Sequence, residues 1–192
     1  MNKEIYTIVG IAPKQIQKLL QNVREKHFLP FETSEQESII ILKDTAHFAI
    51  KRTFSLKEEI SEKELIKRLE KIEFNKEINL NCQKSGTFNQ TKYGPILYAK
   101  INKEEALENL HLEIKKAIDN ISITKDISLE GNNFFPHISF VYNIDKDKIH
   151  EAKGILDSTI LPFSFNIKQI FLLKTINSEK DTRKIIQVLP II

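Results

Sequence analysis

The sequence predicts an α+β protein made of two similar lobes, each an antiparallel sheet with flanking helices, that face each other across a central cleft. Three observations support this. Strand-like and helix-like segments alternate along the chain. A short strand with a histidine, at 47–50, recurs in the second half at 137–140. Pro/Gly/Ser-rich linkers are absent. We therefore expect residues 1–192 to form a single bilobal domain in which each lobe supplies one histidine strand.

The first half of the chain contains strand patterns rich in β-branched residues and helix patterns with apolar residues on one stripe. Proline precedes the first expected helix, and Ser61 is the expected N-cap of the second. The expected elements are, in order, a strand over 5–10, a helix over 13–26, strands over 38–42 and 46–54, a helix over 62–74, a strand over 77–82, a loop over 84–94 and a strand over 95–101.

The second half repeats this theme, again with apolar residues at helical or strand spacing. The expected elements are a helix over 104–121, a strand over 134–142 that holds the second histidine, a helix over 145–156, and strands over 163–176 and 183–189 joined by a turn over 177–181.

Composition narrows the class of protein. The chain has 192 residues, 41% of them hydrophobic, which is enough for a substantial core. A net charge of +3 permits a nucleic-acid or phosphate ligand without requiring one. The single cysteine, Cys82, rules out an internal disulfide and favours a reducing compartment. We find no apolar run of the roughly 20 residues that span a bilayer. The expectation is a cytoplasmic protein that does not bind membranes.

The two histidine strands carry most of the functional information. Residues i and i+2 of a strand project from the same face, so His47 with Ala49, and His137 with Ser139, are expected to point into one cleft. Two imidazoles in one cleft offer a general base and a general acid without a metal, a thiol or a cofactor.

The motifs resemble a known family. The segment His137-Ile138-Ser139-Phe140, preceded by Phe135-Pro136, matches the His-x-Thr/Ser-x motif that occurs twice in the 2H phosphoesterase superfamily, which includes 2′-5′ RNA ligase-like and 2′,3′-cyclic nucleotide phosphodiesterase proteins. The segment His47-Phe48-Ala49-Ile50 keeps the histidine and the spacing of the first motif, but it has Ala49 where the family has Thr or Ser.

This resemblance implies a hydrolase. It implies a metal-independent phosphodiesterase that acts on 2′,3′-cyclic phosphate or 2′-5′ linkages of RNA or nucleotides. His47 and His137 would be the catalytic acid/base pair, and Ser139 would bind the substrate phosphate. The expected partner is an RNA or nucleotide phosphodiester, with no cofactor and no metal site. The chain is expected to be a monomer.

Two further residues are expected to bind substrate. Lys51 shares strand parity with His47 and Ala49, so it is a candidate to replace the missing hydroxyl, whereas Arg52 should point away from the cleft. Tyr93, in the loop before Gly94, is a candidate for stacking on a base.

Plainer interpretations stand beside these. Because Ala49 replaces a hydroxyl residue, the alternative function is a catalytically weak or silent RNA- or nucleotide-binding module on the same fold. An interaction protein with a residual cleft is a third hypothesis. Outside the motifs, His27, His111 and His150 are expected at the solvated surface, and Tyr142 is expected in the core.

Overall fold

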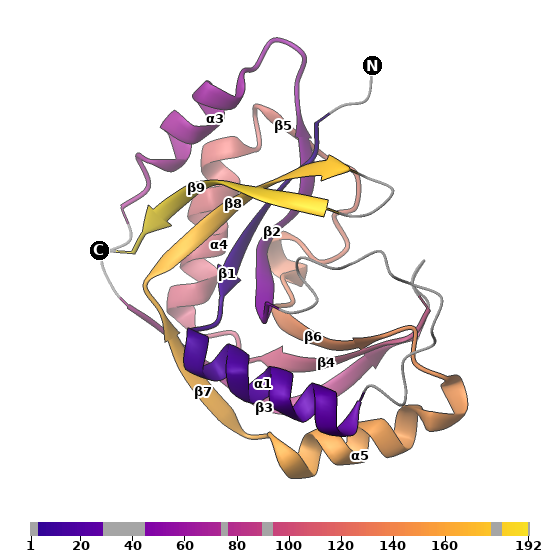
Figure 1. The fold of residues 1–192 in the computed structure, drawn as a ribbon. Helices are drawn as coiled ribbons and strands as arrows, with labels where there is room; N and C mark the ends of the chain where they lie inside the picture. The colour runs from indigo at the N-terminus through magenta and orange to yellow at the C-terminus, as the bar shows by residue number, and fades with distance from the viewer. Residues whose placement is uncertain (1–3, 29–44, 74–76, 90–93, 178–181, 192) are drawn as a thin grey trace.

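The computed structural model describes residues 4–28, 45–73, 77–89, 94–177 and 182–191, which form two antiparallel sheets with helices around them (Figure 1). The elements are β1 (Tyr6–Ile11), α1 (Lys14–His27), β2 (His47–Leu56), α3 (Glu62–Leu69), β3 (Ile78–Phe88), β4 (Ile96–Ile101), α4 (Glu105–Ile118), β5 (Ser122–Thr124), η2 (Gly131–Asn133), β6 (His137–Tyr142), η3 (Lys146–Lys148), α5 (Ile149–Thr159), β7 (Phe163–Ile167), β8 (Gln169–Asn177) and β9 (Thr182–Pro190).

The described strands pair in two sheets, which confirms the predicted fold class. The first sheet has the order β5-β2-β1-β8-β9, and the second has the order β6-β4-β3-β7. The chain passes from the second sheet back to the first at Lys168, between β7 and β8. The single strand expected over 163–176 is therefore two strands that belong to different sheets, and the two lobes exchange segments instead of occupying successive halves of the chain.

Helices cover both sheets. α4 packs against β2, α3 packs on α4, and α5 packs against β3 and β4 (Figure 1). The start of α3 confirms Ser61 as an N-cap, because its hydroxyl accepts a hydrogen bond of 3.2 Å from the Glu64 amide. The buried stripe of α4 consists of Leu107, Leu110, His111, Ile114 and Ile118. The surface position expected for His111 was wrong, since this side chain lies on the stripe that faces β2.

One hydrophobic cluster contains side chains from both sheets, such as Ile8 and Phe54 from the first and Leu80 and Ile101 from the second. Cys82 belongs to this cluster, and burial raises the pKa of its thiol to about 12, which keeps the thiol protonated. Within the described residues, no helix is both long and apolar enough to cross a membrane.

Two other expectations need comment. The loop expected over 84–94 was wrong in its first part, because residues 84–88 continue β3 and pair with β4. Their polar side chains indicated a loop, but the backbone pairing outweighs composition at this edge of the hairpin. The strand expected over 38–42 lies outside the described residues. The short strand β5, which pairs with the end of β2, was not expected from the sequence.

Candidate active site

The first motif strand, β2, contains a β-bulge at the last residue of the motif. Ala49 pairs with Val9, but the next paired residue of β2 is Lys51, opposite Ile8, so Ile50 is an extra residue on this strand. Because of this extra residue, the side chains that follow it point to the opposite faces of the sheet from those that strict alternation predicts. Lys51 is consequently buried, and Arg52 lies half-buried on the face that His47 and Ala49 share.

The second motif strand, β6, has the same bulge at the same place. Ser139 pairs with Tyr98, and Val141 pairs with the next residue, Leu97, so Phe140 is the extra residue. The burial pattern from His137 to Tyr142 repeats the pattern from His47 to Arg52 residue by residue. Tyr142, expected in the core, is half-buried instead, because the bulge turns it to the face of His137.

Both imidazoles are fixed by the main chain in the same way. His47 Nδ1 lies 2.8 Å from the Thr45 carbonyl oxygen, and His137 Nδ1 lies 2.9 Å from the Phe135 carbonyl oxygen. A carbonyl oxygen only accepts, so Nδ1 is the protonated nitrogen in each ring. Nε2 is therefore the atom of each imidazole that exchanges a proton. Both side chains are half-buried, neither sealed inside the protein nor fully exposed.

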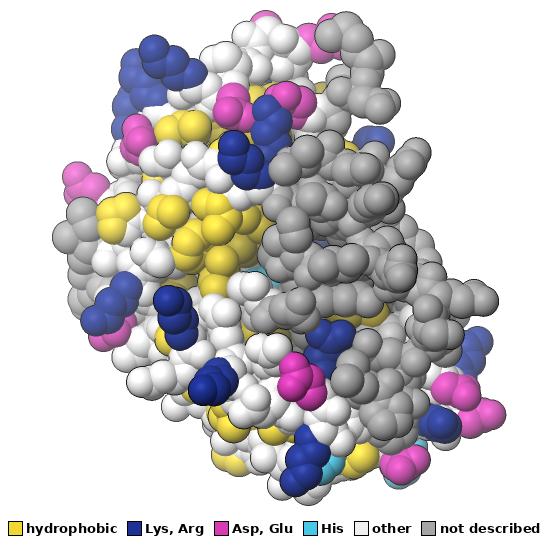
Figure 2. Space-filling view, viewed as in Figure 1, with side chains coloured by type: hydrophobic (Ala, Val, Ile, Leu, Met, Phe, Trp, Pro, Cys, Tyr) yellow, Lys and Arg dark blue, Asp and Glu magenta, His cyan; other side chains and the backbone are white. Residues whose placement is uncertain are grey.

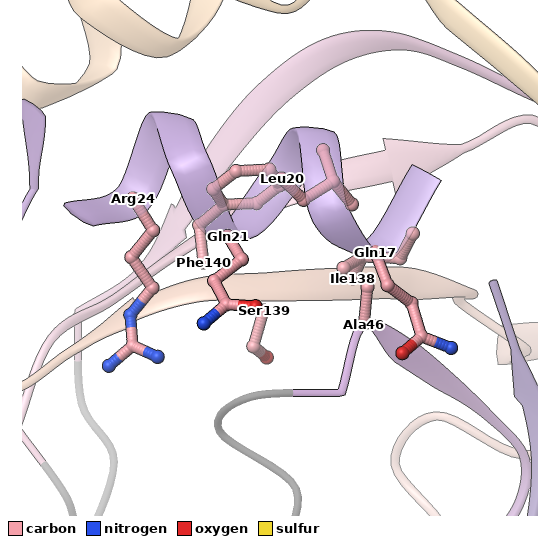
Figure 3. Close-up of a pocket in the computed structure, with 8 residues that line it drawn as sticks. All are labelled: Gln17, Leu20, Gln21, Arg24, Ala46, Ile138, Ser139 and Phe140. Atoms are coloured by element: carbon pink, nitrogen blue, oxygen red, sulfur yellow. The ribbon is translucent and has the colours of Figure 1, made fainter. Parts of the chain in front are cut away.

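The two motif strands meet where the two sheets meet. β2 and β6 are in contact, although they belong to different sheets (Figure 1). A hollow beside them is lined by Ala46, which precedes His47, and by Ser139 of the second motif (Figure 3). The Ser139 hydroxyl has no hydrogen-bond partner among the described residues. It is available to a ligand in this hollow.

Lys51 departs from its sequence-based expectation. Its ammonium is buried and lies 3.0 Å from Glu130 Oε2 and 2.9 Å from Thr124 Oγ1. The side-chain exposures of the ion pair are 2% for Lys51 and 3% for Glu130. The bulge at Ile50 reverses the parity from which a cleft position was expected. Lys51 therefore serves as the internal counter-ion of Glu130, and we do not carry it forward as a substrate contact.

Glu130 and His111 together hold the bulged part of β2. The Arg52 amide donates to Glu130 Oε1 over 2.9 Å, and His111 Nδ1 donates to the Ile50 carbonyl over 2.7 Å. His111 Nε2 accepts from the Gly131 amide, so both ring nitrogens are used. Burial lowers the pKa of His111, which keeps it neutral. These side chains supply hydrogen-bond partners for backbone groups at the edge of β2, in the part of the strand that does not pair with β5.

Arg52 is the functional candidate that the sequence prediction missed. Its Nη1 lies 2.7 Å from Asp126 Oδ2 and 3.3 Å from Ser128 Oγ, which leaves Nη2 and Nε without a partner among the described residues. Its positive charge contributes to the lowered pKa of His137, a residue of the other sheet, so Arg52 acts electrostatically on the second motif. A bulge cannot be recognised from strand alternation alone, and it was the bulge that decided the direction of this side chain.

Aromatic rings surround His137. The ring centroid of His137 lies 4.9 Å from that of Phe88, 5.4 Å from that of Tyr98 and 5.9 Å from that of Phe135. The Tyr98 ring covers Gly86, where a Cβ would lie 2.4 Å from the phenol oxygen, so glycine is required there. Burial lowers the pKa of His137, and Arg52 lowers it further, whereas the hydrogen bond to Phe135 opposes the shift. The neutral imidazole is favoured at neutral pH.

Tyr93 lies outside the described residues. Among the residues that the structure does describe, no group of three or more His, Cys, Asp and Glu side chains is arranged to hold a metal ion. On the face shown in Figure 2, charged side chains of both signs are mixed around a central apolar area. The charged side chains visible on this face are therefore not of a single sign.

Comparisons with known proteins identify a family and several structures with a similar fold. The family model described as the 2′-5′ RNA ligase superfamily matches residues 12–179. The fold is similar to that of Escherichia coli LigT complexed with phosphate, at 15% identity over 99% of this chain and 98% of that one, with a TM-score of 0.65. It is also similar to a Thermus thermophilus protein, TT0787, at 11% identity over 97% of both chains, with a TM-score of 0.66.

A third structure with a similar fold is Kluyveromyces marxianus Usb1 with uridine monophosphate, at 13% identity over 98% of both chains and a TM-score of 0.53. By sequence comparison, no curated protein gives a significant match.

Proposed function

The chain belongs to the 2′-5′ RNA ligase superfamily, and we propose that it is a phosphodiesterase that hydrolyses 2′,3′-cyclic phosphate or 2′-5′ linkages of RNA or nucleotides. One observation carries the proposal. Each histidine stands at the head of a strand with the same bulge, and each has its Nδ1 bound to the carbonyl two residues earlier. Two strands in contact therefore each supply one Nε2 atom that can exchange a proton with a substrate.

In the proposed reaction, water attacks phosphorus and the bond from phosphorus to a ribose oxygen breaks. His137 is the base that takes the proton of the attacking water at Nε2, because its lowered pKa keeps it neutral. His47, protonated, donates the proton on Nε2 to the departing ribose oxygen. The product of a cyclic substrate is a phosphomonoester, and each imidazole ends in the protonation state in which the other began.

Ser139 and Arg52 would stabilise the charge on the phosphate. The Ser139 hydroxyl donates to one non-bridging oxygen from the second motif. The first motif has no such donor at Ala49, and the free nitrogens of Arg52, on the same face of β2, would supply the positive charge instead. Support for a phosphate ligand also comes from the similar folds, since LigT structures contain phosphate or 3′-AMP.

The experiment is turnover of 2′,3′-cyclic nucleotides, cyclic-phosphate RNA ends and 2′-5′ oligomers in excess EDTA. We expect product, and we expect His47→Gln and His137→Gln each to lower kcat by about 10²- to 10⁴-fold. His150→Gln is the matched control, because His150 is exposed on α5, and it should keep full activity. No product from any of the three substrate types would overturn the proposal.

The alternative, a silent RNA- or nucleotide-binding module, rests on Ala49 alone. It would show saturable binding of cyclic-phosphate ends and no product at any time, with or without divalent metal. The same assay therefore separates the two functions.

A further inference from the structure

Helix α1 connects the two histidine motifs. At its start, the Ala12 amide donates to the Ala46 carbonyl over 2.9 Å, next to His47, and Gln17 Nε2 donates back to the Ala12 carbonyl over 2.6 Å. At its end, the Phe28 ring packs edge-on against Phe140 of the second motif, with 6.1 Å between centroids. The helix is thus fixed at one end to the first motif and at the other end to the second.

One face of α1 is polar where it borders the hollow. Gln17, Gln21 and Arg24 follow the i, i+4, i+7 spacing of one helix face, and they line the hollow together with Ser139. Figure 3 shows their polar ends and the Ser139 hydroxyl directed to the same side. Leu20 is 5% exposed and anchors this face of the helix.

The chemistry of this lining suits a nucleotide. The hollow combines one guanidinium, two carboxamides and a serine hydroxyl with apolar side chains, and none of its eight described lining residues is acidic. A guanidinium recognises phosphate, and carboxamides offer both donors and acceptors to a sugar or a base edge. Because Ser139 lines the same hollow, a nucleotide bound here would adjoin a phosphate held at the histidines.

We propose that this α1 face is a subsite for the nucleotide next to the reacting phosphate, with Arg24 on the adjoining phosphodiester. This inference rests on the proposed function. It states that the preferred substrate is the end of an RNA chain and not a free mononucleotide. A cyclic mononucleotide has no second phosphate to reach Arg24. An oligonucleotide that ends in the same cyclic phosphate has one.

The test compares a 2′,3′-cyclic mononucleotide with a short RNA that ends in the same nucleotide as a 2′,3′-cyclic phosphate. For the wild-type protein, we expect kcat/KM to be higher for the RNA. Arg24→Gln should lower the ratio of the two kcat/KM values about tenfold, and it should reduce the slope of log affinity against log salt by about one for the RNA. Arg24→Lys should recover part of the ratio, because it keeps the charge but not the planar fork.

Lys26→Gln is the matched control. Lys26 is exposed on the same helix, on the side opposite Gln17 and Arg24, and it carries the same charge. This variant should leave the ratio unchanged. An equal ratio in wild-type and Arg24→Gln proteins, or an equal loss in both Gln variants, would overturn the inference.

A binding measurement separates this inference from the proposed function. If the wild-type protein turns over neither substrate, the proposed function fails, and the subsite is then tested by the Kd of the same RNA and mononucleotide. The subsite would still be supported if the wild-type protein bound the RNA more tightly than the mononucleotide, and if Arg24→Gln but not Lys26→Gln removed this difference. Equal Kd values for the RNA in all three proteins would overturn it.

Discussion

The two motif strands have the same backbone but different surroundings. β2 and β6 share the bulge position, the burial pattern and the main-chain hydrogen bond to the histidine. Around β2 the neighbours are charged: the buried pair Lys51–Glu130 and the pair Arg52–Asp126. Around β6 the neighbours of His137 are aromatic rings, and the position equivalent to Lys51 is the apolar Val141.

This difference indicates a division of roles between two strands of the same geometry. Burial lowers the pKa of His137, which suits a base, and the same strand also provides the hydroxyl of Ser139. The other strand lacks the hydroxyl at Ala49 but presents a cation, Arg52, whose backbone amide is held by Glu130. The backbone determines where the groups point, and the local environment determines what each group does.

The largest expected effect is on stability, at the buried ion pair. Lys51→Met leaves Glu130 buried without its counter-ion and should lower the free energy of unfolding by about 3–5 kcal/mol, measured by urea denaturation. The double variant Lys51→Met/Glu130→Gln should recover part of the loss, because no charge is then buried. A loss below about 1 kcal/mol, as for a surface pair, would contradict the environment assigned to β2.

Substitutions at the equivalent positions 139 and 49 should change activity by different amounts. Ser139→Ala should lower kcat/KM for a cyclic nucleotide about a hundredfold, the usual effect of losing one preorganised donor. The reverse change at the equivalent position, Ala49→Ser, should raise it less than about tenfold, because Arg52 already supplies charge there. A gain at position 49 as large as the loss at position 139 would show that Arg52 does not compensate.

Arg52→Gln tests the connection between the two strands. Removing the cation should lower kcat/KM about tenfold and should raise the pKa of His137, since Arg52 helps to lower it. The acidic limb of the kcat/KM profile, which lies below about pH 6.5 in the wild type, should move up, and NMR titration of the His137 ring should follow it. Lys26→Gln again controls for net charge. An unchanged His137 titration would exclude an electrostatic effect of Arg52 on His137.

The smallest effect concerns pH and stability. Burial lowers the folded-state pKa of both His111 and His137, so the unfolded chain binds more protons below the ordinary histidine pKa of about 6.5. The stabilisation is complete above pH 6.5 and is lost as the pH falls below it. The urea midpoint should therefore decrease as the pH is lowered from 8 to 5.5. Carboxylates titrate below this pH range. A constant or rising midpoint would contradict these shifts.

Much of the fold was predictable from the sequence, because its signals are local. The periodicity over 13–26 and 104–121 predicted α1 and α4 to within a few residues, and the N-cap at Ser61 was correct. The pairing of β7 and β8 in different sheets was not predictable, because the strand-like segment over 163–176 has no proline or glycine to mark a change of sheet. Strand β5 was missed because it has three residues, too few for alternation to show.

At the site, the sequence pointed to two strands that the structure brings into contact, but it did not give every side-chain direction correctly. Alternation predicted that Lys51 shares a face with His47 and that Arg52 does not, and the bulge at Ile50 exchanges the two. The stripe of α4 carries His111 beneath β2, where a hydrogen bond to Ile50 stabilises the bulge that the sequence does not reveal. Such directions depend on pairing between distant segments, which a single sequence does not contain.

The central claim is that the two imidazoles act on one phosphate, and a crystal structure with bound inorganic phosphate tests it most directly. The account predicts one phosphate ion with its oxygens within about 2.6–3.2 Å of Nε2 of both His47 and His137, and with Ser139 as a further contact. A phosphate that reaches only one of the two histidines, or two rings that face separate surfaces, would contradict it.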